Sequence, residues 1–463
     1  MEGVPEQALL KATIAPEGGK TSLYVVLVAA SAAISGFLFG YDTAVINGAL
    51  VYLRLDFKLS PFETGQVASV LLWGCAVGAA LAGYLSDRYG RRAVLFMAGV
   101  LFCISALGAA FPTHLWQLLV ARVLGGLAIG SASLIAPLYI AEIAPAKVRG
   151  TLVTLNQLAI VSGILIAFMS NYGLAHLARD NWRWMFGLGA VPALALCVSL
   201  VWIPESPRWL LQRGQRDRAG AVLRQISPGE DTDAEMNEIA RAISEESGTY
   251  RELLSIALRK PLVLTIMLAI IQQITGINTV LYYGAIVFAE HAGATAGEAI
   301  GMNVMVGVIN LLFTIAALAM IDRLGRRPLL LTATGGMGLC LLVFAAMLRW
   351  LPGQSMLLLA PVLGYVACFA FGLGSGVWVC MSELLPNRVR GRAMSVATMV
   401  LWISVSLVTA TFLSLIKLFS VQTVFLGYAI LCMASFIYIH ARLPETKNRT
   451  LEEIAGIWKS KKA

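Results

Sequence analysis

Charged residues are scarce in this chain: Asp, Glu, Lys and Arg together make up 13% of its 463 residues, about half of the share that is usual in soluble domains. Hydrophobic residues reach 58%, so water is not the main solvent of the folded chain. The sequence has four histidines and seven cysteines, and neither set shows the spacing of metal ligands. No nucleophile–base pair or phosphate-binding loop is visible either. These absences argue against a metal centre, a bound cofactor and an enzyme.

Apolar runs of about 20 residues dominate the pattern, and each is long enough to cross about 30 Å of hydrocarbon as a helix. The twelve runs are Leu23–Leu50, Val67–Tyr84, Ala93–Phe111, Leu115–Ile140, Leu152–Leu174, Trp184–Val201, Pro261–Val287, Ile300–Ile321, Pro328–Leu348, Met356–Cys380, Met394–Leu415 and Val421–Ile439. The sequence therefore predicts an all-α integral membrane protein that crosses the lipid bilayer with twelve transmembrane helices. Residues 1–20 are too polar for a signal peptide, so we expect the first span to stay in the mature protein.

Basic residues give the chain a formal net charge of +9, but they are not gathered on one domain as nucleic-acid binding would need. They are concentrated in alternate loops between the spans, which face the cytoplasm according to the positive-inside rule. We therefore expect a multi-pass protein of the plasma (inner) membrane, with both termini in the cytoplasm and no nucleic-acid partner.

Three charged motifs occur twice and in the same order. Asp87-Arg88-Tyr-Gly-Arg91-Arg92 returns as Asp322-Arg323-Leu-Gly-Arg326-Arg327, at an offset of 322 − 87 = 235. Glu142 returns as Glu383, at 383 − 142 = 241, and Glu205 returns as Glu445, at 445 − 205 = 240. This order predicts two pseudo-symmetric six-helix halves. The expected divisions are a cytoplasmic N-terminal segment (1–20), the first half (21–203), a cytoplasmic linker with short helices (204–260), the second half (261–442) and a cytoplasmic tail (443–463).

The repeated charges lie where spans end at the cytoplasm, and there they can pair across helices and separate when the halves tilt. The plainer alternative is a topology signal, but that would need only Arg or Lys and no acidic residue at a fixed spacing. We predict a conformational gate on the cytoplasmic side. Its expected members are Asp87, Arg88, Arg91, Arg92, Glu142, Arg149, Glu205, Arg208, Asp322, Arg326, Arg327, Glu383, Arg390 and Glu445.

Four strings identify a family. They are Arg122-Val-Leu-Gly125-Gly126, Pro204-Glu205-Ser206-Pro207-Arg208-Trp209-Leu210, Gln272-Gln273-Ile-Thr275-Gly276-Ile-Asn278 and Pro444-Glu445-Thr446-Lys447. With them the chain resembles, from end to end, the sugar porters of the major facilitator superfamily, and in particular the bacterial sugar–proton symporters and the facilitative glucose transporters. The resemblance implies the major facilitator fold and alternating access to a monosaccharide or polyol bound between the halves.

Amide and aromatic side chains within the spans suit a sugar, because amides donate and accept hydrogen bonds and aromatic rings cover its apolar face. The residues that look like sugar-contacting positions of the family are Gln157, Gln272, Gln273, Asn278, Tyr282, Asn310, Phe369, Trp378 and Trp402. Gln272, Gln273 and Asn278 are expected within two turns of one helix. The alternative for any one amide is a hydrogen bond between helices.

Two departures from the family pattern concern the second half. Span 10 has Gly374-Ser375-Gly376 where many members have Gly-Pro, so we expect a glycine hinge there. Span 11 has Leu401 where relatives often have an amide, and Val405 on the same face is apolar as well. The choice among hexose, pentose and inositol therefore stays open.

Asp42 is a carboxylate in an otherwise apolar span, and such a residue is costly without a function. Arg122 lies at a similar depth, since each is 20 residues, or about 30 Å of helix, from the cytoplasmic side, as 42 − 22 and 142 − 122 show. Burial and a nearby guanidinium act in opposite directions on the proton affinity of a carboxyl group. A pair that forms in one state and breaks in another therefore couples protons to conformation. The resemblance implies the same role for this Asp, and the alternative is a static buried pair.

We expect a secondary active transporter that imports a monosaccharide, most readily a hexose such as glucose or galactose, by proton symport. Its partners are the sugar, protons and the lipid bilayer, with the proton as the coupling ion, no cofactor and a monomeric chain. The alternatives are a passive sugar uniporter, a pentose or inositol symporter, and a non-transporting sugar sensor. A sensor of this fold usually needs a long signalling tail, and residues 443–463 are short for that purpose.

Overall fold

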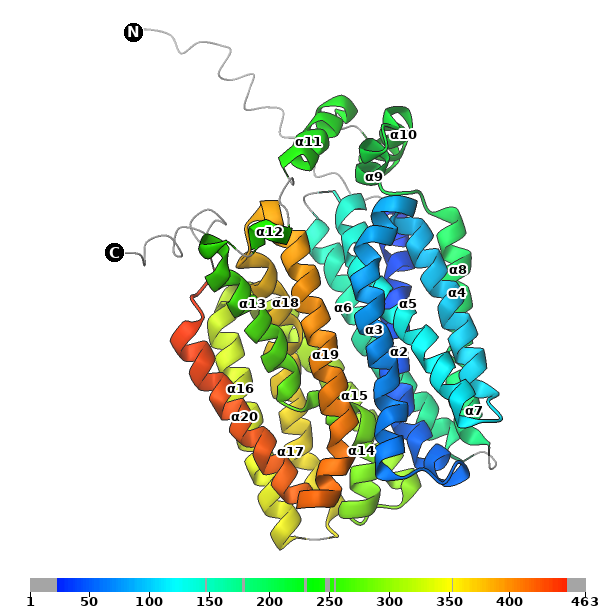
Figure 1. Cartoon of the computed structure of the whole chain (residues 1–463), viewed down its shortest axis with the longest axis vertical. Coiled ribbons are helices and arrows are strands. Elements are labelled where there is room, and N and C mark those ends of the chain that lie inside the picture. Colours follow the sequence, from blue (N-terminus) through cyan, green and yellow to red (C-terminus); the bar gives the residue numbers. More distant parts are fainter. Residues whose placement is uncertain are drawn as a thin grey trace, which may run out of the picture.

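The computed structural model describes residues 23–145, 148–176, 180–228, 231–245, 250–253, 255–351 and 353–447. Every regular element within these ranges is a helix (Figure 1). The expected N-terminal segment 1–20 and the tail beyond residue 447 lie outside the described residues.

Twelve helical spans in the described residues are long and apolar enough to cross a membrane, which confirms the predicted fold class. The spans of the first half are α2 (Leu23–Asp56), α3 (Pro61–Tyr89), α4 (Arg91–Ala110), α5 (Leu115–Ile143), α6 (Arg149–Leu174), and α7 (Asn181–Gly187) with α8 (Ala190–Trp202). Those of the second half are α13 (Ile256–Ile274) with α14 (Ile277–His291), α15 (Ala296–Leu324), α16 (Arg326–Trp350), the tenth span described below, α19 (Asn387–Phe419) and α20 (Val421–Arg442).

The second and eighth spans begin in the same way. Ser60 and Thr295 are 295 − 60 = 235 residues apart. The side-chain hydroxyl of each accepts a hydrogen bond from the backbone N–H of a glutamate three residues later, and the carboxylate of that glutamate accepts one from the backbone N–H of the Ser or Thr. This reciprocal capping box satisfies backbone N–H groups that a helix start leaves without partners. The duplication that the charged motifs indicate therefore extends to how the helices start.

The seventh span is not one helix, contrary to the expectation for Gln272, Gln273 and Asn278. It breaks between α13 and α14, where Gly276 has a φ of 88°. This left-handed conformation favours glycine, and a Cβ atom at Gly276 would lie 2.8 Å from the Tyr428 ring. The three amides therefore come from two helices, α13 and α14, which meet at Gly276.

The tenth span is also interrupted. It consists of α17 (Ser355–Cys368), a π-helical segment η1 (Phe369–Gly374) and α18 (Ser375–Glu383). The π-helical segment ends at Gly374, the first residue of the expected hinge, whereas Ser375 and Gly376 begin α18. Short π-helical segments often occur at functional sites.

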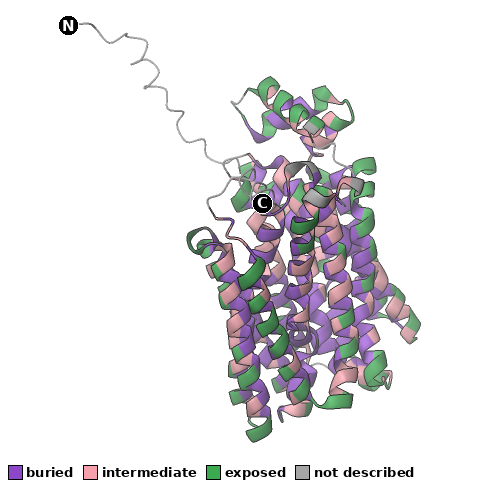
Figure 2. Cartoon of the chain, turned by 60° about the vertical axis from the view of Figure 1, so that its left-hand side comes forward, coloured by how far each residue is buried: buried purple, intermediate pink, exposed green. Residues whose placement is uncertain are grey.

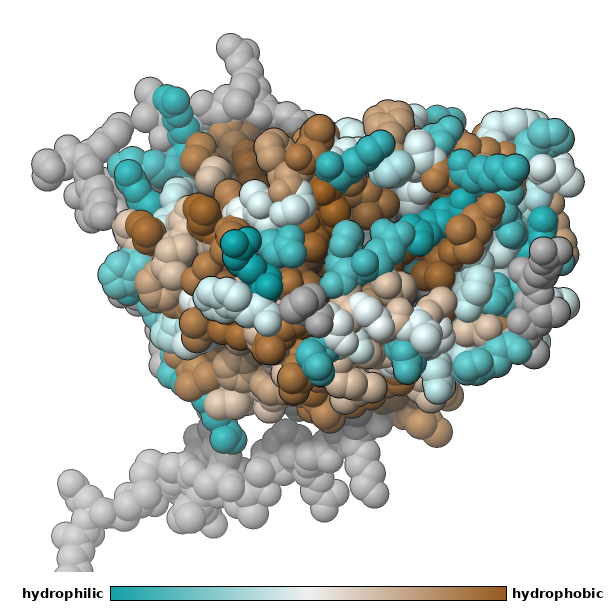
Figure 3. Space-filling model, turned by 90° about the horizontal axis from the view of Figure 1, so that it is seen from below, coloured by the Kyte–Doolittle hydropathy of each residue, from teal (hydrophilic) through white to brown (hydrophobic). Residues whose placement is uncertain are grey.

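The linker helices α9 (Pro207–Gln212), α10 (Arg216–Ile226), α11 (Thr232–Glu245) and α12 (Tyr250–Leu253) lie beyond one end of the bundle, which we name the linker end (Figure 1). The opposite end is named the far end. Hydrophilic side chains run across the far-end face between hydrophobic ones (Figure 3). Along the sides of the bundle, the helices have exposed residues on their outer faces and buried residues toward the interior (Figure 2). Large hydrophobic side chains such as Leu194 and Ile430 are among the exposed ones. A hydrocarbon surface of this kind suits lipid.

Close backbone contact holds the helices of the first half together. A Cβ atom at Gly40 of α2 would overlap the carbonyl of Ile160 on α6, and one at Gly163 would overlap the carbonyl of Phe37. Small residues at such contacts are typical of packing between membrane helices. Contacts between the halves run mainly between α3 and α19, α6 and α15, and α2 and α14.

Candidate functional site

A cavity of about 320 Å³ lies between the two halves. Helices α2, α5 and α6 line it from the first half, and α13, α14, α15, η1, α18 and α19 line it from the second. Its residues include Thr154, Leu318 and Val379, which are within about two helical turns of the linker ends of their helices. The cavity therefore reaches from the middle of the bundle toward the linker end.

All nine residues that the sequence singled out for a sugar line this cavity, namely Gln157, Gln272, Gln273, Asn278, Tyr282, Asn310, Phe369, Trp378 and Trp402. Gln157 comes from the first half and the other eight come from the second. Leu401 and Val405 also line it, so the apolar face expected for span 11 does face the cavity.

The three amides of the seventh span form one chain of hydrogen bonds. Asn278 Nδ2 donates to Gln273 Oε1 at 2.6 Å, and Gln273 Nε2 donates to Gln272 Oε1 at 3.4 Å. Gln272 Nε2 donates to the carbonyls of Leu373 and Gly374, at 2.9 and 3.2 Å. Gln272 thus partly fits the alternative of a helix–helix contact, because its amide serves backbone groups of the π-helical region.

Four cavity-lining side chains have a buried polar atom without a hydrogen-bond partner in the part of the chain that the structure describes: Thr43 Oγ1, Asn156 Oδ1, Ser375 Oγ and Trp402 Nε1. Buried polar atoms are normally paired, so these atoms mark where a polar ligand would be satisfied. Sequence reasoning missed three of them. Asn156 was within reach, since it directly precedes Gln157, whereas an isolated Thr or Ser in a span carries little signal.

The far end of the cavity is closed by contacts between α2 and α14. Asn47 Nδ2 donates to the carbonyls of Leu281 and Val280, at 2.9 and 3.3 Å, and Asn47 Oδ1 accepts from the Ala285 N–H at 3.3 Å. Nearer the surface, Arg54 forms an ion pair with Glu290. Sequence reasoning did not select these residues, although Asn47 is a polar residue inside an apolar span.

The structure brings Asp42 and Arg122 together. Arg122 Nη1 donates to Asp42 Oδ1 at 2.7 Å, and the Arg122 side chain is completely buried. The guanidinium also lies 5.5 Å from the centre of the Phe186 ring. The two faces of α2 differ here: Phe39 and Thr43 line the central cavity, whereas Asp42 points away from it toward α4 and α5.

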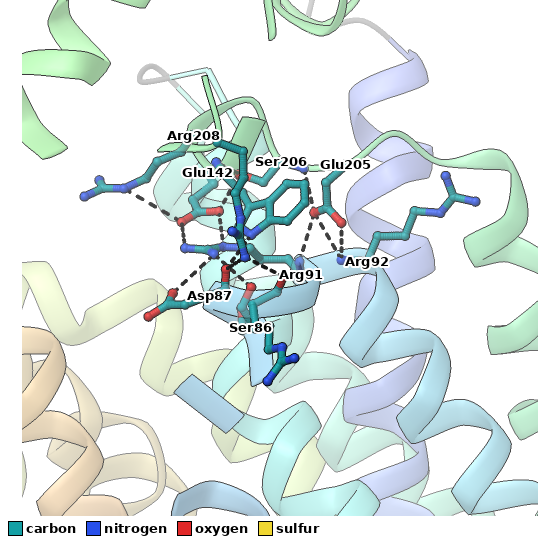
Figure 4. A network of polar contacts seen from close by, with 11 residues as sticks. Ser86, Asp87, Arg91, Arg92, Glu142, Glu205, Ser206 and Arg208 are labelled. Atoms are coloured by element: carbon teal, nitrogen blue, oxygen red, sulfur yellow. Dashed lines mark hydrogen bonds and ion pairs between the residues drawn. The ribbon is translucent and has the colours of Figure 1, made fainter. Parts of the chain in front are cut away.

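Charged residues of the first half form a cluster at the linker end (Figure 4). Arg91 binds Glu142 through two hydrogen bonds, from Nε to Oε2 at 2.9 Å and from Nη2 to Oε1 at 3.1 Å. Ser206 Oγ donates to Glu142 Oε2 at 2.5 Å, and Arg208 Nε lies 3.9 Å from Glu142 Oε1. The cluster joins α4, α5 and the start of the linker.

Glu205 caps the N-terminus of α4. Its carboxylate accepts hydrogen bonds from the backbone N–H groups of Arg91, Arg92 and Ser206, at distances of 2.8 to 3.2 Å. An anion is favoured at this position by the helix dipole and by the free N–H groups. Burial nevertheless raises the pKa of the Glu205 carboxyl above its ordinary value, and the backbone hydrogen bonds oppose this effect.

The second half repeats the arrangement. Arg326 donates to Glu383 Oε1 from Nε and Nη2, at 3.2 and 2.9 Å, and Thr446 Oγ1 donates to Glu383 Oε2 at 2.6 Å. Glu445 accepts from the backbone N–H groups of Arg326 and Arg327, both at 3.1 Å, at the start of α16. The charged residues that repeat in the sequence therefore form equivalent contacts at the linker end of both halves.

Three expected gate residues have contacts outside the gate. Arg88 donates to the Tyr84 hydroxyl, Arg149 to the Ala144 carbonyl and Arg390 to the Leu385 carbonyl. Asp87 is mostly exposed and lies 3.5 Å from Arg91. The Asp322 side chain lies outside those that the structure describes.

Both charged clusters connect helices within one half. The gate predicted from the sequence, in which these charges hold the linker end together when the far end is open, stays a prediction. The cavity separates the halves at this end, so the ion pairs form inside each half. The linker follows the same division. Trp209 Nε1 and Arg213 Nη2 donate to the Asp87 carbonyl of the first half, at 3.0 and 2.9 Å. Leu253 of α12 instead packs against Leu385 and Val389 of the second half.

Comparisons with known proteins agree with this architecture. The family model described as "Sugar (and other) transporter" matches residues 28–458. The glucose transport protein of Synechocystis is 38% identical, with 93% of this chain and 97% of that protein covered. The D-xylose-proton symporter of Escherichia coli K12 is 36% identical, with 94% and 96% covered. A solved structure of the xylose transporter XylE from E. coli, in a partially occluded inward-open conformation, is 33% identical and superposes with a TM-score of 0.83 over 93% of this chain and all of that chain. The chain therefore belongs to the sugar transporter family, the sugar porters of the major facilitator superfamily.

Proposed function

We propose that this protein imports a monosaccharide together with a proton by alternating access. One observation carries the proposal: a single helix, α2, lines the polar central cavity with Thr43 and holds the Asp42–Arg122 pair on its other side. The relatives named as a glucose transport protein and a D-xylose-proton symporter support it. A change in the charge of Asp42 thus acts on the helix that also contacts the sugar.

The sugar is bound mainly by the second half. Gln273, Asn278 and Asn310 supply amide groups, and Trp378 and Trp402 supply apolar faces. The unpartnered Trp402 Nε1 donates to a sugar oxygen. Gln157 and Asn156 complete the site from the first half. A hexose such as glucose or galactose is the substrate that we propose first, in keeping with the glucose transport protein among the relatives.

A pentose is the second candidate, and the wall formed by Leu401 and Val405 favours it. These side chains offer no hydrogen bond, and a buried hydroxyl without a partner is costly. A smaller sugar with fewer hydroxyl groups avoids this cost. The D-xylose-proton symporter among the relatives is consistent with this alternative.

The linker end is cytoplasmic in this proposal, because the basic loops lie there, and the chain acts as a monomer in the plasma membrane. The conformation is then inward-facing, since the cavity reaches toward the linker end while Asn47 and the Arg54–Glu290 pair close the far end. The two charged clusters stiffen each half, so that the halves rock as bodies around the sugar.

Proton coupling follows from the Asp42–Arg122 contact. When the pair is intact, the guanidinium favours the ionised carboxylate. When the pair opens, burial of the carboxyl in an apolar span favours its protonation. Because helix α2 also forms the far-end closure through Asn47, the protonation of Asp42 and the opening of the far end involve the same helix.

The test is uptake into proteoliposomes of labelled glucose, galactose, xylose, arabinose and inositol, with and without an inward proton gradient. Wild type is expected to accumulate one of these sugars only with the gradient. D42N is expected to lose accumulation and to keep sugar exchange, because exchange needs no net proton movement. The exposed carboxylate Asp180 supplies the control D180N, which is expected to accumulate normally. Accumulation by D42N at the wild-type level would contradict proton coupling through Asp42.

A further inference from the structure

A small chamber lies behind the Asp42–Arg122 pair, on the side of α2 away from the central cavity. Its volume is about 20 Å³, and its walls include Tyr41 and Asp42 of α2, Ser105 of α4, Phe186 of α7 and Gly189. One water molecule needs roughly 10 to 15 Å³ of such space and two to four polar partners. The size of the chamber therefore suits a single water.

Two oxygens are placed to hold that water. Asp42 Oδ2 is buried and has no hydrogen-bond partner among the described residues, since Arg122 uses Oδ1. A Cβ atom at Gly125 would overlap Ser105 Oγ and lie 3.6 Å from Asp42 Oδ2. The two oxygens are thus no more than about 6 Å apart, a span that one water covers with two hydrogen bonds of up to about 3 Å.

Ser105 supplies the hydroxyl available to bind this water. The other hydroxyl in the chamber wall, that of Tyr41, already forms hydrogen bonds elsewhere. The break between α7 and α8 directs the Gly189 N–H to the Phe186 carbonyl. The Met185 carbonyl accepts from the Tyr41 hydroxyl at 2.9 Å. The Tyr41 oxygen also lies 3.4 Å from Ser170 Oγ.

We propose that Ser105 and a water in this chamber form the route by which Asp42 gains and loses its proton, separate from the sugar cavity. Ser105 is a positioning residue: it holds the water that hydrogen-bonds Asp42 Oδ2. The proposal rests on the function proposed above. It implies that a sugar bound in the central cavity does not block protonation, so sugar and proton bind in either order.

The other groups that face Asp42 set the background for any pH effect. They are Tyr41 on α2 itself, Arg122 on α5, Cys75 on α3 and Tyr282 on α14. No substitution in the test touches them, so a change in pH profile reports on the chamber. Gly125 gives a second way to alter it, since an added methyl group would intrude between Ser105 and Asp42.

The experiment measures sugar uptake against external pH in proteoliposomes for wild type, S105A, S105T, G125A and D42N. Ser435 supplies the matched control S435A, because it is equally buried and its hydroxyl donates to its own helix at Leu431. S105A is expected to move the pH midpoint of uptake upward by roughly one unit, since the ionised carboxylate loses a hydrogen bond. Sugar exchange and sugar binding stay as in wild type. S105T, which keeps the hydroxyl, and S435A keep the wild-type midpoint.

G125A is expected to shift the midpoint as S105A does, and it replaces S105A if that variant does not fold. If S105A and G125A fold and both keep the wild-type pH midpoint of uptake, the route through Ser105 is overturned. A D42N protein that still accumulates sugar overturns instead the proposed proton coupling, and this inference falls with it. The two outcomes are distinguishable. If only the route through Ser105 is wrong, D42N still fails to accumulate sugar.

Discussion

Arg54 of α2 and Glu290 of α14 form an ion pair that joins the two halves at the far end of the bundle. The buried pairs Asp42–Arg122 and Arg91–Glu142 lie within the first half instead. The contacts between Arg54 and Glu290 must therefore break when the protein opens at the far end. The Arg91–Glu142 pair moves with the first half and need not break.

Reversing the charge of Arg54 or of Glu290 is expected to favour the conformation that is open at the far end. Partly exposed pairs contribute about 0.2 to 1 kcal/mol, so R54E or E290R should change the ratio of open to closed protein by roughly 1.4- to fivefold. Spin labels at the exposed far-end residues Leu55 and Leu351 measure the separation. The double variant R54E/E290R restores the pair and the wild-type distribution; a double variant as open as the singles would contradict a direct interaction.

Asn47 is expected to contribute more than the ion pair. N47A removes buried hydrogen bonds between the halves, a loss of roughly 1 to 2 kcal/mol at membrane-protein values. Asn171 supplies the control, because its amide donates to the Ala44 and Val45 carbonyls of the same half. N171A should lower the unfolding temperature without opening the far end. Equal opening by the two variants would show that any buried amide has this effect.

The two equivalent ion pairs at the linker end differ in burial. The Arg91 and Glu142 side chains are 4% and 5% exposed, and those of Arg326 and Glu383 are 14% and 23% exposed. Breaking a buried pair costs about 3 to 5 kcal/mol because a charge is left without its partner, and solvent reduces this cost in the second half. E142Q should therefore lower the unfolding temperature in detergent more than E383Q. The reverse order would mean that burial does not govern these pairs.

Glu205 is expected to make stability depend on pH. Burial raises its pKa in the folded protein above the ordinary value of 4.5, so the folded state takes up a proton at a higher pH than the unfolded state. The stability contributed by this group is then present below 4.5 and is lost as pH rises through the folded pKa. E205Q removes this pH-dependent contribution. The difference in unfolding temperature between wild type and E205Q should therefore change as the pH rises from 4.5 through the pKa of Glu205 in the folded protein. A constant difference would contradict the raised pKa.

Leu401 is expected to influence the choice of sugar. L401Q adds an amide to the apolar wall of the cavity, where it gains a hydrogen bond to a sugar hydroxyl. One such bond contributes about 0.5 to 1.5 kcal/mol, so the ratio of kcat/KM for glucose over xylose should rise by roughly two- to tenfold. L401M conserves volume without adding a polar group and should leave the ratio unchanged. An equal change in both variants would point to packing.

The spans and the cavity residues were predictable because their causes are local or are shared with a family. Hydrophobic length alone gives a span such as α16. The nine cavity residues follow from the resemblance to the sugar porters, and three of them lie in the motif Gln272–Asn278. Asp42 and Arg122 could be matched by depth because helices rise by a constant amount per residue.

The remaining features depend on relations that a single sequence does not contain. The break at Gly276 arises where the Tyr428 ring approaches the backbone, and nothing near Gly276 in the sequence announces that ring. Asn47 looks like any amide in a span until α14 is placed beside it. The charged motifs repeat in each half, but only the conformation decides whether they pair within a half or between halves.

The attachment of the linker divides the molecule mechanically. Trp209 and Arg213 tie α9 to the backbone at Asp87 in the first half, and α10 and α11 pack with α9. Leu253 ties α12 to the second half. Helix α11 therefore moves with the first half, and helix α12 moves with the second half. The distance between two fluorophores, one on α11 and one on α12, would report every rocking cycle from outside the bilayer, without a label near the sugar.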